Sequence, residues 1–419
     1  MSATDPAVAG GVLVIGGDYK SLGVVRSLGR QGIRVWVLRD DHVLAGWSRY
    51  CERTLPWPAV SEPERVEYLI GLARAHGLSG WALFPADEEP AALLARNRDA
   101  LGEHFRLGIL APWETLRWAY DKRLTYQLAA ELGVAHPRTL TPRDKEDVAG
   151  YDGAFPAILK PAFRPELNRF TISKAWPVTD RASLVARYEE ASALLDPDLI
   201  MIQELIPGGG ETQFSYAALC KAGRPLASLV ARRTRQWPMD FGRASTYVET
   251  VDDPDVEETG RRVLAALRFD GIVELEFKRD PRDGRLKLLD INPRIWGWHT
   301  LARRAGVDFP YLLWRMLHGE PIAQTRGRPG VRWVRALTDV PQAFTEIRAG
   351  RLSPVSYIAS LRGPIEFAVL AGDDPLPALI ELPITLLLLA RRHAASAARP
   401  IPRGVDAMAA ARSANVGPR

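Results

Sequence analysis

Cysteine and lysine are scarce in this 419-residue chain, which has two cysteines, Cys51 and Cys220, and eight lysines against 47 arginines. Two cysteines exclude a disulfide framework and supply no metal-ligand spacing, so each is predicted to be a small apolar residue. No run of Lys and Arg with interleaved aromatic residues occurs, which excludes nucleic acid as the main partner. The N-terminus lacks a charged segment followed by an apolar one, and this predicts a reducing, cytoplasmic setting.

Long apolar runs are also missing. The most apolar stretch, residues 376–390, is too short to span a bilayer and is interrupted by Glu381 and Pro383. We expect a core or oligomer helix there, with a peripheral membrane contact through residues 376–392 and a homodimer as open alternatives. From Ala394 the chain is rich in small residues, Pro and Arg, and it is predicted to be disordered.

The overall composition is that of an ordinary globular protein. Hydrophobic residues make up 47% of the chain and charged residues 25%, and the length suits two or three domains. The formal charge of +5 is mildly basic. Such an excess suits anionic small-molecule substrates, such as a nucleotide and a carboxylate.

The most informative stretch runs from Gly271 to Trp298. Apolar and charged residues alternate over residues 272–278, residues 281–284 contain Pro and Gly, and residues 285–291 resume as a second strand. This pattern predicts a β-hairpin.

Two acids face each other in the predicted hairpin, Glu276 on the first strand and Asp290 on the second. Asn292 lies two residues after Asp290, so both side chains point to one face, and Arg294 can join them. Two carboxylates and an amide are hard oxygen ligands that suit Mg²⁺, or Mn²⁺ in its place, while Arg294 offers a fork for phosphate oxygens. A solvated hairpin is the alternative, but the apolar flank over residues 288–296 indicates burial, and buried acids need partners.

Arginines crowd the end of an earlier predicted strand, residues 227–232. Arg233 and Arg235 are predicted to capture anions, a carboxylate and a phosphate, because arginine binds such groups through two nitrogens. A solvated basic strand end is the alternative.

The N-terminal part predicts an open parallel α/β domain. Residues 11–15 read as a strand, residues 16–28 as a glycine-bearing loop and helix, and residues 32–38 as the next strand. The glycine spacing is not G-x-G-x-x-G, so a dinucleotide oxidoreductase is a weak alternative. Asp87 and Glu88 follow a further strand, at an edge where such sheets place ligands; helix capping by Asp87 is an equal alternative.

The segments E-F-K and D-I-N-P-R of the hairpin resemble the metal-binding end of the ATP-grasp superfamily. With Q-E-L-I-P-G and R-R-T-R-Q-W-P, the chain resembles the carboxylate–amine ligase branch, which includes D-aspartate ligase and carbamoyl-phosphate-synthase-like proteins. The resemblance implies a two-lobed ATP-grasp fold with antiparallel sheets. It implies an N-terminal domain over residues 1–118, an ATP-grasp domain over 119–325 with a small lid lobe at about 140–205 and a large lobe at about 206–325, a C-terminal extension over 326–393, and a tail over 394–419.

The resemblance also implies roles for residues outside the hairpin. A single predicted helix over residues 113–133 carries Lys122, and a predicted strand ends at Lys160. The resemblance assigns both lysines to the ATP phosphates, the adenine to a hinge made of Glu204, Leu205 and Ile206, and the ribose to Glu211. One departure is the segment over residues 161–173, which lacks the glycines that usually cover the phosphates. A loop that faces solvent is the default interpretation, and covering of the phosphates by the side chains of Arg164, Asn168 and Arg169 is the alternative.

The implied activity is ATP-dependent joining of a small carboxylate, such as an amino acid, to an amine through an acyl phosphate. ATP and Mg²⁺ would be the cofactors, and ADP and phosphate the by-products. A nucleotide-binding sensor or scaffold without turnover is the alternative from another class.

Overall fold

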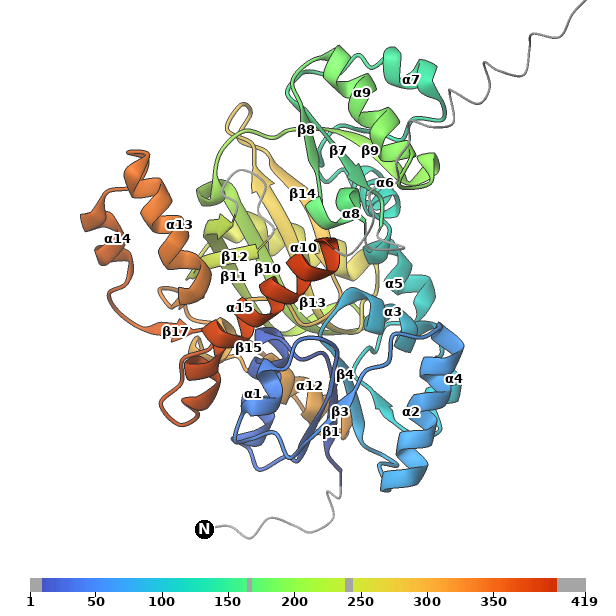
Figure 1. Ribbon diagram of the computed structural model, residues 1–419, viewed down its shortest axis with the longest axis vertical. Coiled ribbons are helices and arrows are strands. Elements are labelled where there is room, and N and C mark those ends of the chain that lie inside the picture. The colour runs from blue at the N-terminus through green and yellow to red at the C-terminus, as the bar shows by residue number, and fades with distance from the viewer. Residues whose placement is uncertain (1–9, 164–167, 238–243, 398–419) are drawn as a thin grey trace, which may run out of the picture.

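The first strand, β1 (Val12–Ile15), is buried on both faces. Its residues Leu13 and Ile15 share a hydrophobic cluster with α2 (Glu62–His76), whereas Val12 and Val14 share another with α1 (Tyr19–Gly29). Helices on both sides explain why β1 is a continuous apolar run rather than an alternating one. The computed structural model describes residues 10–163, 168–237 and 244–397, and Figure 1 shows the chain from blue to red.

The N-terminal domain is built on a five-stranded parallel sheet. Its strand order is β3 (Arg53–Pro56), β2 (Val35–Arg39), β1, β4 (Ala82–Pro85) and β5 (Arg106–Leu107). The remaining helical elements are η1 (Leu44–Trp47), α3 (Glu88–Arg96) and α4 (Arg98–Gly102). The carboxyl ends of β1 and β4 turn toward the rest of the molecule, which places the residues after them at the site described below.

A small lobe follows, with a four-stranded antiparallel sheet. The strand order is β6 (Thr139–Leu140), β9 (Ile200–Glu204), β7 (Ala157–Pro161) and β8 (Trp176–Val178). Its helical elements are α7 (Lys145–Ala149), α8 (Arg169–Ser173), α9 (Arg181–Ser192) and η2 (Pro197–Leu199). The lobe has its own hydrophobic cluster, and it stands at the top of Figure 1.

The large lobe is built on an eight-stranded sheet that contains the predicted hairpin. Seven strands follow the order β14 (Leu286–Asn292), β13 (Gly271–Arg279), β10 (Gln213–Lys221), β11 (Arg224–Trp237), β12 (Ala244–Val251), β16 (Arg332–Val334) and β17 (Ile365–Phe367), and β15 (Thr325–Arg326) pairs with β11. Its helical elements are η3 (Gly210–Thr212), α10 (Pro254–Ala266), α11 (Thr300–Arg304) and α12 (Phe309–Leu317).

The C-terminal residues pack on the large lobe, because β16 and β17 extend its sheet. They also contribute the helices α13 (Ala336–Arg348), α14 (Pro354–Ser360) and α15 (Leu376–Ala397). Disorder from Ala394 is wrong for residues 394–397, which continue α15 in a run where alanine, the best helix former, is frequent. Residues 398–419 lie outside the described part of the chain. Among the described residues, no helix is long and apolar enough to cross a membrane.

The single helix predicted over residues 113–133 is wrong, because the structure has two helices there, α5 (Trp113–Tyr120) and α6 (Lys122–Glu131). Asp121 has an extended backbone between them, and its carboxylate accepts a hydrogen bond of 2.9 Å from the Arg123 backbone N–H. An aspartate that caps a helix in this way ends the preceding one. The break places Lys122 at the start of α6.

Candidate functional site

Two adjoining cavities lie where the three parts of the chain meet. The inner cavity, of about 200 Å³, is lined by residues of the small lobe and the hairpin, and the outer cavity, of about 940 Å³, is lined by the N-terminal domain and the large lobe. They share Glu88, Tyr120, Lys174, Arg233, Glu276 and Asn292. The predicted hairpin therefore borders both cavities.

The hairpin pairs its two acids as predicted, because Glu276 of β13 lies directly opposite Asp290 of β14. Asn292 donates a hydrogen bond of 3.0 Å from Nδ2 to Glu276 Oε1. The pairing of β13 with β14 shifts by one residue between Glu276 and Phe277. Glu276 pairs with Asp290 and Phe277 with Leu288, so Leu289 has no partner on β13. Such a bulge turns a strand locally, and here the Leu289 carbonyl accepts a hydrogen bond of 2.9 Å from the Tyr126 hydroxyl.

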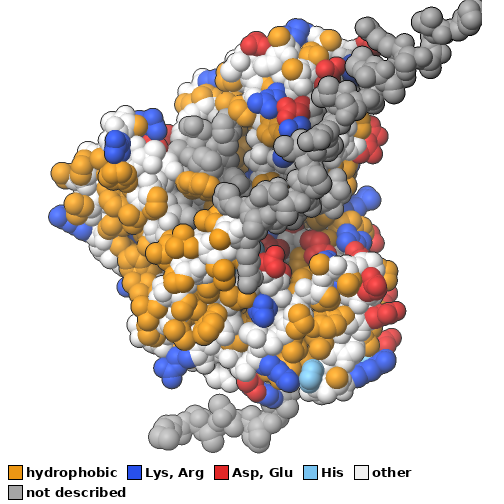
Figure 2. All heavy atoms as spheres, viewed as in Figure 1, with side chains coloured by type: hydrophobic (Ala, Val, Ile, Leu, Met, Phe, Trp, Pro, Cys, Tyr) orange, Lys and Arg blue, Asp and Glu red, His pale blue; other side chains and the backbone are white. Residues whose placement is uncertain are grey.

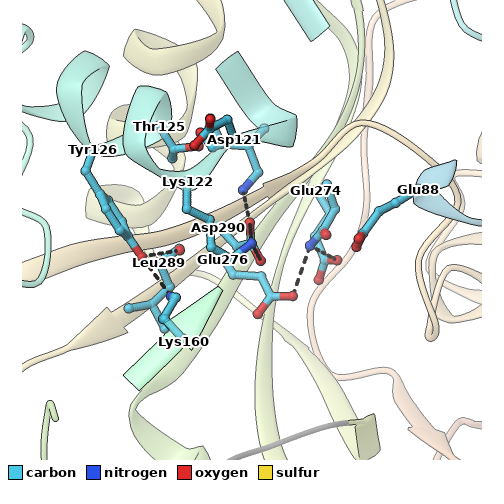
Figure 3. A network of polar contacts seen from close by, with 12 residues as sticks. Glu88, Asp121, Lys122, Thr125, Tyr126, Lys160, Glu274, Glu276, Leu289 and Asp290 are labelled. Atoms are coloured by element: carbon cyan, nitrogen blue, oxygen red, sulfur yellow. Dashed lines mark hydrogen bonds and ion pairs between the residues drawn. The ribbon is translucent and has the colours of Figure 1, made fainter. Parts of the chain in front are cut away.

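A cation neutralises each acid of the pair. The Arg233 guanidinium binds Glu276. Lys122 Nζ lies 2.8 Å from Asp290 Oδ2, and Figure 3 shows this second pair. Burial alone would raise the pKa of Glu276, but the charges of Arg233 and Lys174 and the hydrogen bond from Asn292 hold that pKa below its ordinary value. Asp290 also raises the pKa of Lys122 against the effect of burial.

Lys160 of β7 points into the inner cavity without a carboxylate partner among the contacts the structure describes. Its Nζ donates hydrogen bonds of 3.1 Å to the Tyr126 hydroxyl and to Gln203 Oε1. Burial and the nearby charge of Lys122 lower the pKa of Lys160 to about 7. A bound anion such as a phosphate would favour the charged form of Lys160.

Arg294 connects the hairpin to the N-terminal domain. Its Nη2 donates 2.7 Å to Glu88 Oε1, at the start of α3, and 3.2 Å to Asn292 Oδ1. The neighbouring Asp87 caps no helix through its side chain and pairs with Lys20 instead, which decides against the capping alternative. Both acids at the end of β4 therefore face the outer cavity.

The hinge prediction places Glu204, Leu205 and Ile206 at the site, and the structure places all three in the wall of the inner cavity. The Glu204 carboxylate binds Lys287 at 2.6 Å and Arg282 at 2.8 Å. These ion pairs fix the Glu204 side chain at the end of β9.

Two predicted residues, Glu211 and Arg235, line neither cavity. Glu211 lies in η3, where its carboxylate accepts a hydrogen bond of 2.9 Å from the Gly209 backbone N–H in the glycine turn. Arg235 binds Asp339 of α13 through two nitrogens, at 2.9 and 2.8 Å, and stacks on Tyr247. The register of β11 against β12 shifts between Arg232 and Arg235, which separates Arg235 from Arg233.

The covering residues predicted for the glycine-free segment also point elsewhere. Asn168 caps α8 and donates 2.9 Å to the Leu194 carbonyl, and Arg169 pairs with Glu190 of α9 at 2.9 Å. Arg164 lies outside the described residues. Lys174, at the end of α8, lines both cavities in their place.

Sequence reasoning missed Glu274, a buried carboxylate on the same face of β13 as Glu276. It accepts hydrogen bonds from the Ser215 hydroxyl at 2.8 Å and from Trp298 Nε1 at 3.0 Å. Burial and the charge of Glu276 raise the pKa of Glu274 to about 7. The alternation that identified Glu276 also pointed to Glu274, whereas Tyr126 and Gln203 carried no sequence signal.

The site offers oxygen ligands for a metal ion from two carboxylates and one amide. Within residues 10–163, 168–237 and 244–397 no group of three or more His, Cys, Asp or Glu side chains could hold a metal ion. The set Glu276, Asp290 and Asn292 fits a hard cation that keeps part of its water shell, which is the behaviour of Mg²⁺.

Comparison with known proteins gives a consistent result. Residues 198–340 match the family model described as ATP-grasp in the biosynthetic pathway with Ter operon. The chain is 23% identical over 357 residues to the carbamoyl phosphate synthase large chain of Thermomicrobium roseum, covering 81% of this chain and 30% of the relative. It is 21% identical over 250 residues to D-aspartate ligase of Enterococcus faecium, covering 56% of this chain and 58% of the relative. The chain thus spans less than two thirds of either relative.

Solved structures share the fold. An L-amino acid ligase from Bacillus licheniformis superposes with a TM-score of 0.57 at 17% identity, covering 74% of each chain. A phosphoribosylamine–glycine ligase from Thermotoga maritima superposes with a TM-score of 0.56 at 14% identity, covering 77% of this chain and 78% of the other. The predicted fold class, a parallel α/β domain followed by a two-lobed fold with antiparallel sheets, is confirmed. Residues 198–340 thus resemble an ATP-grasp family, and the chain shares the fold of these ligases, with the facing acids of the hairpin and the lysines between its lobes.

Proposed function

We propose that the protein is an ATP-dependent carboxylate–amine ligase that forms an amide bond through an acyl phosphate. The observation that carries the proposal is the pair Glu276 and Asp290, which form ion pairs with Arg233 and Lys122 at the junction of two cavities. A structural ion pair would need no adjoining cavity. We assign the inner cavity to ATP and the outer cavity to the carboxylate and the amine.

Each group of the inner cavity has a proposed task. Lys122 and Lys160 bind phosphate oxygens, and the backbone of residues 204–206 binds the adenine. Glu276, Asp290 and Asn292 would hold Mg²⁺, which when bound neutralises charge on the transferring phosphate. Arg233 and Arg294 stabilise the same charge from the outer cavity, where they meet the substrate carboxylate. Arg235 and Glu211, which line neither cavity, have no role in this proposal.

The reaction follows in two steps. An oxygen of the substrate carboxylate attacks the γ-phosphorus, the bond to the β-phosphate oxygen breaks, and ADP leaves. The amine nitrogen then attacks the carbonyl carbon of the acyl phosphate, phosphate leaves with the electrons of the C–O bond, and the nitrogen loses a proton. Water must stay away from the intermediate, and closure of the small lobe, residues 140–205, is the movement we propose for this purpose.

One observation favours the alternative of a nucleotide-binding sensor without turnover. Asn168 and Arg169 are engaged with Leu194 and Glu190, so neither side chain covers the inner cavity. A site with less cover would bind nucleotide and admit water more easily.

The test is ADP release from Mg²⁺-ATP by the full chain, with amino acids and small carboxylates offered singly and in pairs. We expect release that requires one particular pair and that is lost in Glu276→Gln, which removes the charge and keeps the size. Glu67→Gln, at an exposed position of α2, is the matched control and should release ADP at the wild-type rate. ATP binding with no release from any pair would favour the sensor.

A further inference from the structure

Helix α15 is almost entirely apolar over its first fifteen residues. Between residues 376 and 390 its one charged residue is Glu381, which lies on the inner side, 3.6 Å from Arg335. The same inner side packs Ala378 and Ile384 against the hydrophobic cluster below, next to η1. A helix without a polar face is normally covered on every side.

The outer side of α15 is nevertheless exposed. Leu379 is 72% exposed, Leu386 57% and Leu382 53%. We call the whole set the leucine face, and it consists of Leu376, Leu379, Leu382, Leu386, Leu387 and Leu389. Six exposed leucines on one helix far exceed the scattered apolar residues of an ordinary surface.

The neighbouring helices continue the apolar surface. Val340 and Phe344 of α13 and Val355 and Ile358 of α14 are each more than half exposed. Figure 2 shows hydrophobic side chains gathered over this side of the molecule, around α13, α14 and the beginning of α15. The surface is therefore broad rather than a narrow groove for one peptide.

The charge of the chain is concentrated directly after the leucine face. Residues 391–419 contain six arginines and one aspartate, a formal charge of +5, which equals the net charge of the whole chain. Residues 1–390 are therefore formally neutral. An apolar helix face followed by a cationic segment has the composition of a helix that lies in the interface of a bilayer with anionic lipids.

We propose that the leucine face docks on an anionic lipid bilayer, with α15 lying in the interface and the basic C-terminal segment bound to the lipid headgroups. Charge distinguishes a bilayer from a second copy of the chain as the partner of this face. A second copy would bring two C-terminal segments of formal charge +5 together, and these repel each other, whereas anionic headgroups attract such a segment. Two weak signals, apolar insertion and cation attraction, together give stable attachment. The proposal is independent of the ligase reaction.

The test is co-sedimentation of the full chain with vesicles of equal phosphatidylglycerol and phosphatidylcholine, beside vesicles of phosphatidylcholine alone. We expect binding to the anionic vesicles only, weakening as salt is raised. Leu386→Glu should reduce the affinity by about tenfold or more, because it removes one inserted leucine and adds a repelled charge. Val60→Glu makes the same change at an exposed apolar position before α2 and should bind as the wild type does.

A second variant keeps the test decisive if Leu386→Glu fails to fold. Arg391→Gln/Arg392→Gln leaves the leucines in place and should weaken binding to the anionic vesicles. Failure of the wild type to bind them, or equal binding to both kinds of vesicle, would overturn the proposal. So would a dimer, measured by sedimentation velocity, that dissociates in Leu386→Glu while no vesicle is bound.

Discussion

At the scale of single residues, the site is a balance of buried charges. Arg233 and Lys122 each hold one acid of the hairpin, whereas Lys160 lies beside them with two neutral partners, the Tyr126 hydroxyl and the Gln203 amide. Each acid of the pair thus has a cation beside it, whereas burial and the charge of Lys122 lower the pKa of Lys160 to about 7. That lysine is the group whose state an incoming phosphate would change most.

Nucleotide binding should therefore take up a proton at Lys160. With a pKa lowered to about 7 in the free protein, Lys160 is mostly neutral at pH 8, and a phosphate beside it favours the charged form. The affinity for nucleotide should fall as the pH rises from 7 to 9, because binding takes up a proton and the proton concentration falls over this range. Titration calorimetry at pH 8 in buffers of different ionisation enthalpy measures the uptake.

The control for this prediction is Lys160→Met, which keeps the length of the side chain and cannot accept a proton. It should bind nucleotide more weakly and without the proton uptake assigned to Lys160. Equal uptake by wild type and variant would assign the proton to another group.

At the scale of elements, glycines decide how closely segments approach behind the site. Gly210 of η3 lies against β11, and a Cβ there would come within 2.4 Å of the Arg233 carbonyl oxygen and 2.6 Å of the Thr234 carbonyl oxygen. Backbone atoms cannot yield as the end of a flexible side chain can. The close approach therefore fixes the strand that carries Arg233.

Gly210→Ala should lower the free energy of unfolding by about 1–3 kcal/mol, the usual cost of overpacking, and should weaken nucleotide binding by displacing Arg233. Urea unfolding and nucleotide titration are the measurements. Gly71→Ala is the contrast, because a Cβ at this position of α2 meets nothing within 4 Å. That variant should gain about 0.5–1 kcal/mol from helix propensity. Loss of stability in both variants would contradict the argument.

The elements also show how far sequence reasoning reaches. The hairpin and its facing acids could be predicted because alternation and turn residues are local signals, and the structure has both strands and the pairing. The position of Arg235 could not, because it depends on a register shift in β11 and on Asp339, 104 residues away. The break at Asp121 could have been predicted from the sequence, because aspartate is a typical helix-capping residue. The apolar periodicity across residues 113–133 nevertheless favoured a single helix. The site roles themselves stay predictions.

At the scale of the whole molecule, the C-terminal residues tie the N-terminal domain to the large lobe. Asp374 is 1% exposed and accepts a hydrogen bond of 2.9 Å from Arg26 Nε of α1. The Ser48 hydroxyl and the Arg49 backbone N–H donate to the same carboxylate. The outer cavity lies between the N-terminal domain and the large lobe. The hydrogen bonds of Asp374 therefore also fix the position of one wall of this cavity relative to the other.

Asp374→Ala should lower the free energy of unfolding by about 3–5 kcal/mol, since it leaves the Arg26 charge buried without its partner. Thermal and urea unfolding measure the loss. Asp373→Ala removes the neighbouring, 43% exposed carboxylate that binds Arg30, and should cost about 1 kcal/mol or less. Equal losses would show that burial of the pair does not matter.

Low pH should destabilise the protein as Asp374→Ala does, because it protonates the Asp374 carboxylate. Burial would raise the pKa of Asp374, but its hydrogen bonds and the Arg26 charge bring the pKa below the ordinary value. The stability from a carboxylate with a lowered folded pKa is fully present above its unfolded pKa, near 4, and is lost as the pH falls through the folded pKa.

The scarcity of lysine gives the site a chemical signature. Lys122, Lys160, Lys174 and Lys278 all line the inner cavity, which is half of the eight lysines in the chain. An amine-acylating reagent therefore has few other targets, and at pH 8 it meets Lys160 in its nucleophilic form. Peptide mass spectrometry after brief acylation would thus read the occupancy of this cavity directly, with bound nucleotide seen as protection of these four side chains.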